Sequence, residues 1–210
     1  TNHLAHFLLT SLVWDKMLKT KGLSRIVNHS SGAHSMGSPS FDKDNLEHPH
    51  HSWGVLGLNF ALWNGLMPFM GMKPIENWKR YGVSKLCNVL FTKELARKIE
   101  GSDLSDKVIA VACHPGYANT NLQNVAKDSI DNWEKMNSGN AQSAADGSLP
   151  LLLCTLGDDI KGGDYCEPNG SMNMKGPPIV GKVGGNGDNK KMAEELWAYS
   201  EECIGTTFSV

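Results

Sequence analysis

The stretch from Lys107 to Gly116, K-V-I-A-V-A-C-H-P-G, decides the fold class. Residues 107–113 form a nearly continuous apolar run with the length of one strand. Such a run is typical of a strand that is buried on both faces of a parallel sheet. Pro115 and Gly116 interrupt the run and predict a turn directly after the strand. We therefore expect an α/β protein with this strand near the middle of its sheet.

Helix and strand patterns alternate on both sides of this strand. The expected elements are a helix at 2–19, a strand at 25–30, helices at 78–100 and 141–156, a short strand at 164–166 and a helix at 190–204. Alternation of this kind predicts right-handed crossovers and a parallel sheet. Residues 168–189 are rich in Gly, Pro and Asn and are expected to be a loop. We find no linker that would divide domains, so 1–210 is predicted to be one domain.

The first helix is predicted to bury a stripe of leucines. Leu4, Leu8 and Leu12 recur at a spacing of four, and Leu9 and Val13 broaden the stripe. Apolar residues at this spacing lie on one face of a helix.

Composition excludes several classes of function. The chain has 210 residues, with 20 basic and 22 acidic side chains and a net charge of −2. This balance argues against nucleic-acid binding, which needs a basic surface. The five cysteines are scattered and contain no C-x-x-C pair, so we expect neither a metal site nor disulfides. A reducing intracellular compartment is the matching expectation.

An apolar insertion at about 35–77 separates the first strand from the next helix. Its centre, 54–72, approaches the length of a membrane span. Asn59, Asn64, Pro68 and four glycines lie inside it and argue against a transmembrane helix. The remaining interpretations are a cap over a substrate pocket, an interface segment or a lobe that touches a membrane.

The sequence Y-G-V-S-K at 81–85 carries the clearest chemical signal. Its spacing places Tyr81 and Lys85 on one face of a helix. A lysine ammonium beside a phenol favours the phenolate, which can exchange a proton with an alcohol or carbonyl oxygen. The pattern alone is weak, because an exposed tyrosine over a lysine stem is common on helices.

Two further segments directly follow expected strands. Ser31 comes after the strand at 25–30, and H-P-G-Y-A-N-T at 114–120 comes after the strand at 107–113. The carboxyl ends of parallel strands are where ligands bind in α/β sheets. Ser31 is thus placed to hydrogen-bond a reacting oxygen, and the turn at 114–120 exposes backbone groups. Either segment alone is equally consistent with an ordinary turn.

Four motifs together are more specific. In chain order they are N-H-L-A-H-F-L-L-T at 2–10, R-I-V-N-H-S-S at 25–31, Y-G-V-S-K-L-C-N-V-L-F-T-K-E-L-A at 81–96 and H-P-G-Y-A-N-T at 114–120. Together they resemble the short-chain dehydrogenase/reductase family, within it the retinol-dehydrogenase-like and WW-domain-oxidoreductase-like branch. L-W-A-Y-S-E-E at 196–202 is similar to the same branch. The resemblance covers most of 1–120 and, more loosely, 141–204.

The resemblance implies a Rossmann-type, doubly wound fold and hydride transfer between NAD or NADP and an alcohol or carbonyl. Tyr81 would be the general acid/base, and Lys85 would support it and bind the nicotinamide ribose. Ser31 would orient the substrate oxygen, and Asn2 would hold a water in a proton relay through Lys85. The residues that would line the nicotinamide side of the cofactor, beside Tyr81 and Lys85, are Pro115, Gly116 and Thr120.

The sequence also departs from the family pattern. The glycine-rich turn T-G-x-x-x-G-I-G, which cradles the pyrophosphate at a helix N-terminus, does not occur in it. G-K-V-G-G-N-G at 181–187 is no substitute, because it follows a polar loop and opens no βαβ unit. The chain thus corresponds to roughly the C-terminal two-thirds of such a domain. A sheet without its first strands is expected to expose an apolar edge and face.

Two hypotheses follow from these observations. The first is an NAD(P)-dependent oxidoreductase acting on a lipophilic alcohol or carbonyl of retinoid, steroid or isoprenoid type, with the insertion as an apolar cap. The second is a non-catalytic accessory subunit, docked through 54–72 on a membrane-bound or other larger assembly. A homodimer is a further expectation.

Overall fold

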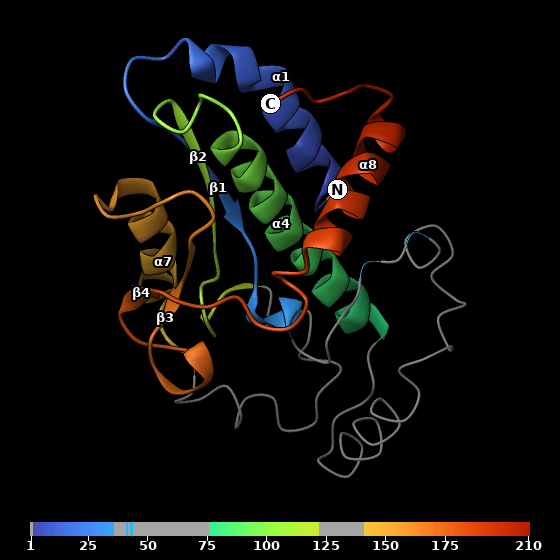
Figure 1. Ribbon diagram of the computed structural model, residues 1–210. Helices are drawn as coiled ribbons and strands as arrows, with labels where there is room; N and C mark the ends of the chain where they lie inside the picture. Colours follow the sequence, from blue (N-terminus) through green and yellow to red (C-terminus); the bar gives the residue numbers. More distant parts are fainter. Residues whose placement is uncertain (1, 36–40, 42, 44–75, 122–140) are drawn as a thin grey trace.

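The structure, a computed structural model, describes residues 2–35, 41, 43, 76–121 and 141–210 (Figure 1). Its strands are β1 (Ser24–His29), β2 (Val108–Cys113), β3 (Tyr165–Pro168) and β4 (Pro178–Val180). Its α-helices are α1 (Leu4–Leu18), α4 (Glu76–Glu100), α7 (Ala144–Leu156) and α8 (Lys190–Ile204). Two short 3-10 helices are η1 (Gly32–His34) and η2 (Ser171–Asn173). The expected helices and the first three strands are therefore confirmed, with small differences at their ends.

The four strands form one sheet in the order β1-β2-β3-β4. β1 runs parallel to β2, and β2 runs parallel to β3. β4 is antiparallel to β3, so the prediction of a loop throughout 168–189 is wrong for this strand. Antiparallel pairing needs only a short connection. The nine residues between the two strands, which include η2, provide it.

Both faces of β2 are buried, as its apolar run predicts. Val108 and Ala110 belong to the core cluster that contains side chains of α1, α4 and α8. Ile109 and Val111 alternate with them and pack with Cys154 of α7. The sheet therefore has α4, with α1 and α8 beside it, on one face and α7 on the other (Figure 1). This is a Rossmann-like α/β arrangement.

The predicted leucine stripe of α1 is wrong. The buried residues of α1 are Phe7, Thr10 and Trp14. The Phe7 ring lies 4.9 Å from that of Trp197 on α8, and aromatic rings bury more area than leucines do. The helix therefore buries the face that carries Phe7 and Trp14 instead of the leucine face. The leucines left exposed, at 38%, 62% and 70%, are Leu8, Leu9 and Leu12.

Within the described residues, β1 pairs with a neighbour on one side only, the side of β2. Leucines are exposed near this edge strand on α1, and Leu152 and Leu156 are exposed on α7. This arrangement agrees with the expectation of an exposed apolar edge and face.

Most of the insertion at 35–77 lies outside the described residues, including the whole of 54–72. Phe41 is described and is buried in a cluster with side chains of α4 and α8. Lys43 forms an ion pair of 2.9 Å with Glu202 of α8. These two residues of the insertion therefore lie against α8. Among the helices that the structure describes, none has the length and apolarity to span a membrane.

Candidate active site

The Tyr81–Lys85 pair lies in the N-terminal part of α4, beside the carboxyl end of β1. The Lys85 ammonium lies 5.8 Å from the centre of the Tyr81 ring. Its Nζ atom donates a hydrogen bond of 3.0 Å to the carbonyl oxygen of His29. Burial lowers the pKa of Lys85. The helix thus brings the two side chains together as their spacing predicts, and β1 holds the ammonium in place.

Ser31 follows β1 and caps η1. Its Oγ atom accepts a hydrogen bond of 3.3 Å from the backbone N–H of Ala33. This bond uses an oxygen lone pair, so the hydroxyl proton itself can be donated to a ligand. The neighbouring Ser30 hydroxyl donates to the carbonyl oxygen of Lys85 at 2.8 Å. Ser31 and Lys85 are therefore connected through one intervening residue.

Asn2 lies just before α1, next to the same turn of α4. Its side-chain amide donates to the Ser84 hydroxyl at 3.1 Å, and Ser84 donates to the carbonyl oxygen of Tyr81 at 2.8 Å. Asn2 is solvent-exposed. The structure therefore places Asn2 beside the turn of α4 that carries Tyr81 and Lys85. The Asn2 amide is hydrogen-bonded to Ser84, the residue before Lys85.

The turn after β2 is held rigidly. Gly116 has a φ of +66°, and a Cβ atom there would overlap the backbone of Met174. The Gln142 side chain donates to the carbonyl oxygen of Pro115 at 2.6 Å. Because β1 and β2 are parallel and in register, this turn and Ser31 lie at the same edge of the sheet. Thr120 is exposed and lies near the end of the described residues at 121.

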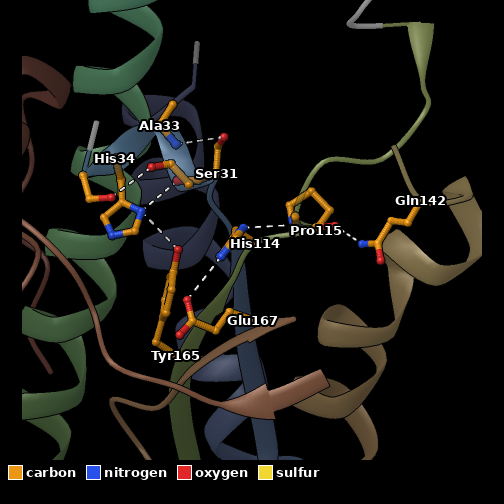
Figure 2. A network of polar contacts seen from close by, with 11 residues as sticks. Ser31, Ala33, His34, His114, Pro115, Gln142, Tyr165 and Glu167 are labelled. Carbon is orange, nitrogen blue, oxygen red and sulfur yellow. Dashed lines mark hydrogen bonds and ion pairs between the residues drawn. The ribbon is translucent and has the colours of Figure 1, made fainter. Parts of the chain in front are cut away.

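A network of buried polar side chains supports this edge of the sheet (Figure 2). His114 Nδ1 accepts the backbone N–H of Gly116 at 3.0 Å, so its proton is on Nε2, which lies 3.3 Å from Glu167. Burial lowers the pKa of His114 to about 4 and raises that of Glu167. The contact is therefore a hydrogen bond from a neutral ring rather than an ion pair. His114 thus holds the backbone of the turn after β2.

Two members of this network carry no signal in the sequence. Tyr165 and Glu167 lie on the short strand β3, where all four residues are buried. The Tyr165 hydroxyl lies 3.1 Å from Nδ1 of His34, 131 residues away in the chain.

The arrangement is suited to proton exchange with a small-molecule oxygen. A phenol, an ammonium group and a serine hydroxyl lie around the carboxyl ends of β1 and β2, and a rigid turn borders them. The described residues contain no group of three His, Cys, Asp or Glu side chains with the geometry of a metal site.

Comparison with known proteins shows what the chain is similar to. Mouse retinol dehydrogenase 12 is 31% identical over 213 residues, which cover 97% of this chain and 52% of the mouse protein. Human retinol dehydrogenase 13 is 40% identical over 121 residues, or 58% of this chain and 28% of the human protein. The chain therefore spans about half the length, or less, of the curated relatives it matches. No protein-family model matches it.

A solved structure supports the fold. An uncharacterised protein from Mycobacterium paratuberculosis superposes with a TM-score of 0.63 at 27% identity, covering 100% of this chain and 59% of that one. The fold and the motif order define a short-chain dehydrogenase/reductase. The chain belongs to this family, in its retinol-dehydrogenase-like branch.

The described residues fit the nicotinamide end of the cofactor that this family implies. Lys85 is a hydrogen-bond donor at the edge of the sheet, as a ribose hydroxyl requires. Pro115 and Gly116 follow β2 and the Ser31 segment follows β1, so they lie at the same edge of the sheet, because the two strands are parallel. The glycine-rich turn for the pyrophosphate is not in this sequence. The fit therefore concerns one end of the cofactor only.

Proposed function

We propose that the protein transfers a hydride between NAD or NADP and a lipophilic alcohol or carbonyl of the retinoid type. The observation that carries this proposal is the placement of Tyr81, Lys85 and Ser31 around one edge of the sheet. The relatives named as retinol dehydrogenases support the substrate class. The apolar stretch 54–72 agrees with a lipophilic substrate.

In this proposal the side chains of the chain handle the proton and the nicotinamide handles the hydride. The nicotinamide, when bound, accepts the hydride from the alcohol carbon or returns it to the carbonyl carbon. In the direction of oxidation, the Tyr81 oxygen takes the hydroxyl proton of the substrate as its C–H bond breaks. Ser31 donates a hydrogen bond to the same substrate oxygen and orients it.

Lys85 has two roles in the proposal. Its ammonium group lies 5.8 Å from the centre of the Tyr81 ring and would attract negative charge that develops there, and its N–H groups would bind the ribose. The bond to His29 holds the ammonium at the end of β1 in both roles. Asn2, through its position beside Ser84, would hold the water that returns the proton to solvent.

Contact of 54–72 with a membrane or another protein, and dimer formation, are further parts of the proposal.

The test is turnover of retinol with NAD and with NADP, followed through the nicotinamide absorbance. We expect Tyr81→Phe to abolish turnover while the cofactor still binds, because only the proton-transferring oxygen is removed. Tyr199→Phe makes the same chemical change on α8 and is the matched control. Full turnover in Tyr81→Phe, or wild-type protein that binds neither cofactor, would refute the proposal. The second result would favour the accessory-subunit hypothesis.

A further inference from the structure

Glu167 is a buried acidic residue that the proposed mechanism does not use. It lies on β3 and is 6% exposed. Its Oε2 atom lies 3.3 Å from Nε2 of His114, which is itself 2% exposed (Figure 2). A carboxylate is costly to place away from water unless it accepts hydrogen bonds. The contact with His114 therefore indicates what Glu167 does.

The two partners of His114 allow only one placement of the ring proton. The backbone N–H of Gly116 donates to Nδ1 at 3.0 Å, so Nδ1 presents its lone pair. A carboxylate only accepts, so Nε2 carries the proton and donates it to Glu167. The other neutral tautomer would turn two N–H donors toward each other at Gly116. Glu167 therefore stabilises the tautomer that can hold the Gly116 amide.

Gly181 leaves room for the Glu167 carboxylate. It directly follows β4, and its backbone N–H donates to the carbonyl oxygen of Tyr165 on β3 at 2.8 Å. A Cβ atom on Gly181 would overlap the carboxylate of Glu167. Gly181 has no left-handed φ, so the space that the carboxylate occupies, and not the backbone conformation, favours glycine here. The glycine-rich segment 181–187 thus begins with a residue that permits the contact between Glu167 and His114.

We propose that Glu167 is a positioning residue for the cofactor, which acts through His114 on the turn at Pro115 and Gly116. The hydrogen bonds run from β3 through the His114 ring to the backbone of Gly116. This inference rests on the proposed function, in which the turn borders the nicotinamide. The conformation of the turn then determines how the nicotinamide end of the cofactor is bound.

The turn keeps other attachments when this one is lost. The Gln142 side chain still donates to the carbonyl oxygen of Pro115 at 2.6 Å. The backbone N–H of Tyr117 still donates to the carbonyl oxygen of Met174 at 2.6 Å. Loss of the Glu167 contact is therefore expected to loosen the turn without unfolding it. Cofactor binding should be affected more than the chemical step.

Glu167→Met removes the carboxylate and keeps an unbranched side chain. We expect KM for the cofactor to rise about tenfold, as for one hydrogen bond to a charged group, while kcat changes less than about twofold. Glu167→Gln keeps a side-chain oxygen that can accept from His114, so its KM should stay within about threefold of the wild-type value. Glu94→Met removes a buried carboxylate further along α4 and is the matched control, expected to change neither value.

Gly181→Ala tests the same link without changing Glu167 or His114. The added Cβ atom displaces the carboxylate, so we expect KM for the cofactor to rise about tenfold here as well. Gly162→Ala is the matched control. A Cβ atom on Gly162 would make only ordinary contacts with Ile109, and its φ is not left-handed. Gly162→Ala should therefore have the wild-type KM.

Hydrogen exchange of the Gly116 amide gives a readout that does not depend on turnover. This amide is expected to exchange about tenfold faster in Glu167→Met and in Gly181→Ala, because its acceptor on His114 is no longer held in place. Its exchange should be unchanged in Gly162→Ala. All variants are made in the full natural chain.

The outcomes separate this inference from the proposed function. Wild-type protein that binds neither NAD nor NADP refutes the proposed function, whereas the exchange of the Gly116 amide still tests the link from Glu167. In an active wild-type protein, an unchanged cofactor KM in both Glu167→Met and Gly181→Ala overturns the inference and leaves the proposed function intact. A nitrogen-15 NMR spectrum that shows the wild-type His114 ring protonated on Nδ1 also overturns it. If Glu167→Met does not fold, Gly181→Ala decides.

Discussion

His3 makes the stability of the protein dependent on pH. The ring is 8% exposed, and its Nε2 lies 2.7 Å from the Ser200 hydroxyl, which itself donates to the carbonyl oxygen of Leu196. Nε2 therefore carries the proton, and Nδ1 has no partner among the described residues. A second proton would place a charge on Nδ1 beside the rings of Phe7 and Phe91. Burial accordingly lowers the pKa of His3 from 6.5 to about 4.

The sign and size of the effect follow from this pKa. Below pH 6.5 the unfolded chain binds a proton at His3, whereas the folded chain binds it only near pH 4. The free energy of unfolding therefore falls as the pH falls from 6.5 to about 4. At about 1.4 kcal/mol for each pKa unit, the full loss is on the order of 3 kcal/mol. By about pH 5 the loss is about 2 kcal/mol.

The assay is urea unfolding at about pH 7.5 and about pH 5. His3→Gln keeps a donor for Ser200 but does not titrate, so we expect it to lose about 2 kcal/mol less than the wild-type protein between these values. His6→Gln changes the exposed neighbouring histidine and serves as the control. Equal losses in His3→Gln and the wild-type protein would refute the assignment of a buried, neutral His3.

Two further predictions concern backbone contacts. Arg25 donates hydrogen bonds of 2.9 and 2.8 Å to the carbonyl oxygens of Cys154 and Gly157 at the end of α7. Arg25→Lys should therefore lower the free energy of urea unfolding by about 1–2 kcal/mol. Arg25→Lys as stable as the wild type would contradict this. Gly116→Ala should lower the free energy of urea unfolding by about 1–3 kcal/mol and weaken NAD(P) binding in a fluorescence titration. The reason is that Gly116 has a φ of +66° and that a Cβ atom there would overlap a backbone carbonyl just after η2. Gly22→Ala, with a φ of +85° and open space around its Cβ, measures the strain alone, and an equal loss there would exclude a role for the overlap.

Much of the fold was predictable because its signals are local. The apolar run at 107–113 predicts β2, since a strand buried on two faces does not alternate. The start of α8 and its buried face also agree with the pattern at 190–204. β4 was not predictable, because three half-exposed residues in a Gly- and Pro-rich segment form a strand only through their pairing with β3.

The orientation of α1 shows that local sequence patterns do not determine which face of a helix is buried. Its leucines outnumber its aromatic residues, so the sequence alone favours the leucine face. Which face is buried depends on Trp197 and Phe208, which lie almost 200 residues further along the chain. Burial of a face requires a partner surface, and the partner is set by tertiary packing.

The site divides in the same way. Sequence by itself determined that Tyr81 and Lys85 share one helix face and that Ser31 directly follows a strand, because both are local properties. Only the tertiary structure decided that the Tyr165 hydroxyl and the His34 imidazole lie 3.1 Å apart, since the two residues are 131 positions apart in the chain. Hydrogen bonds within a buried network depend on distances between elements, and no pattern within a single element encodes such distances.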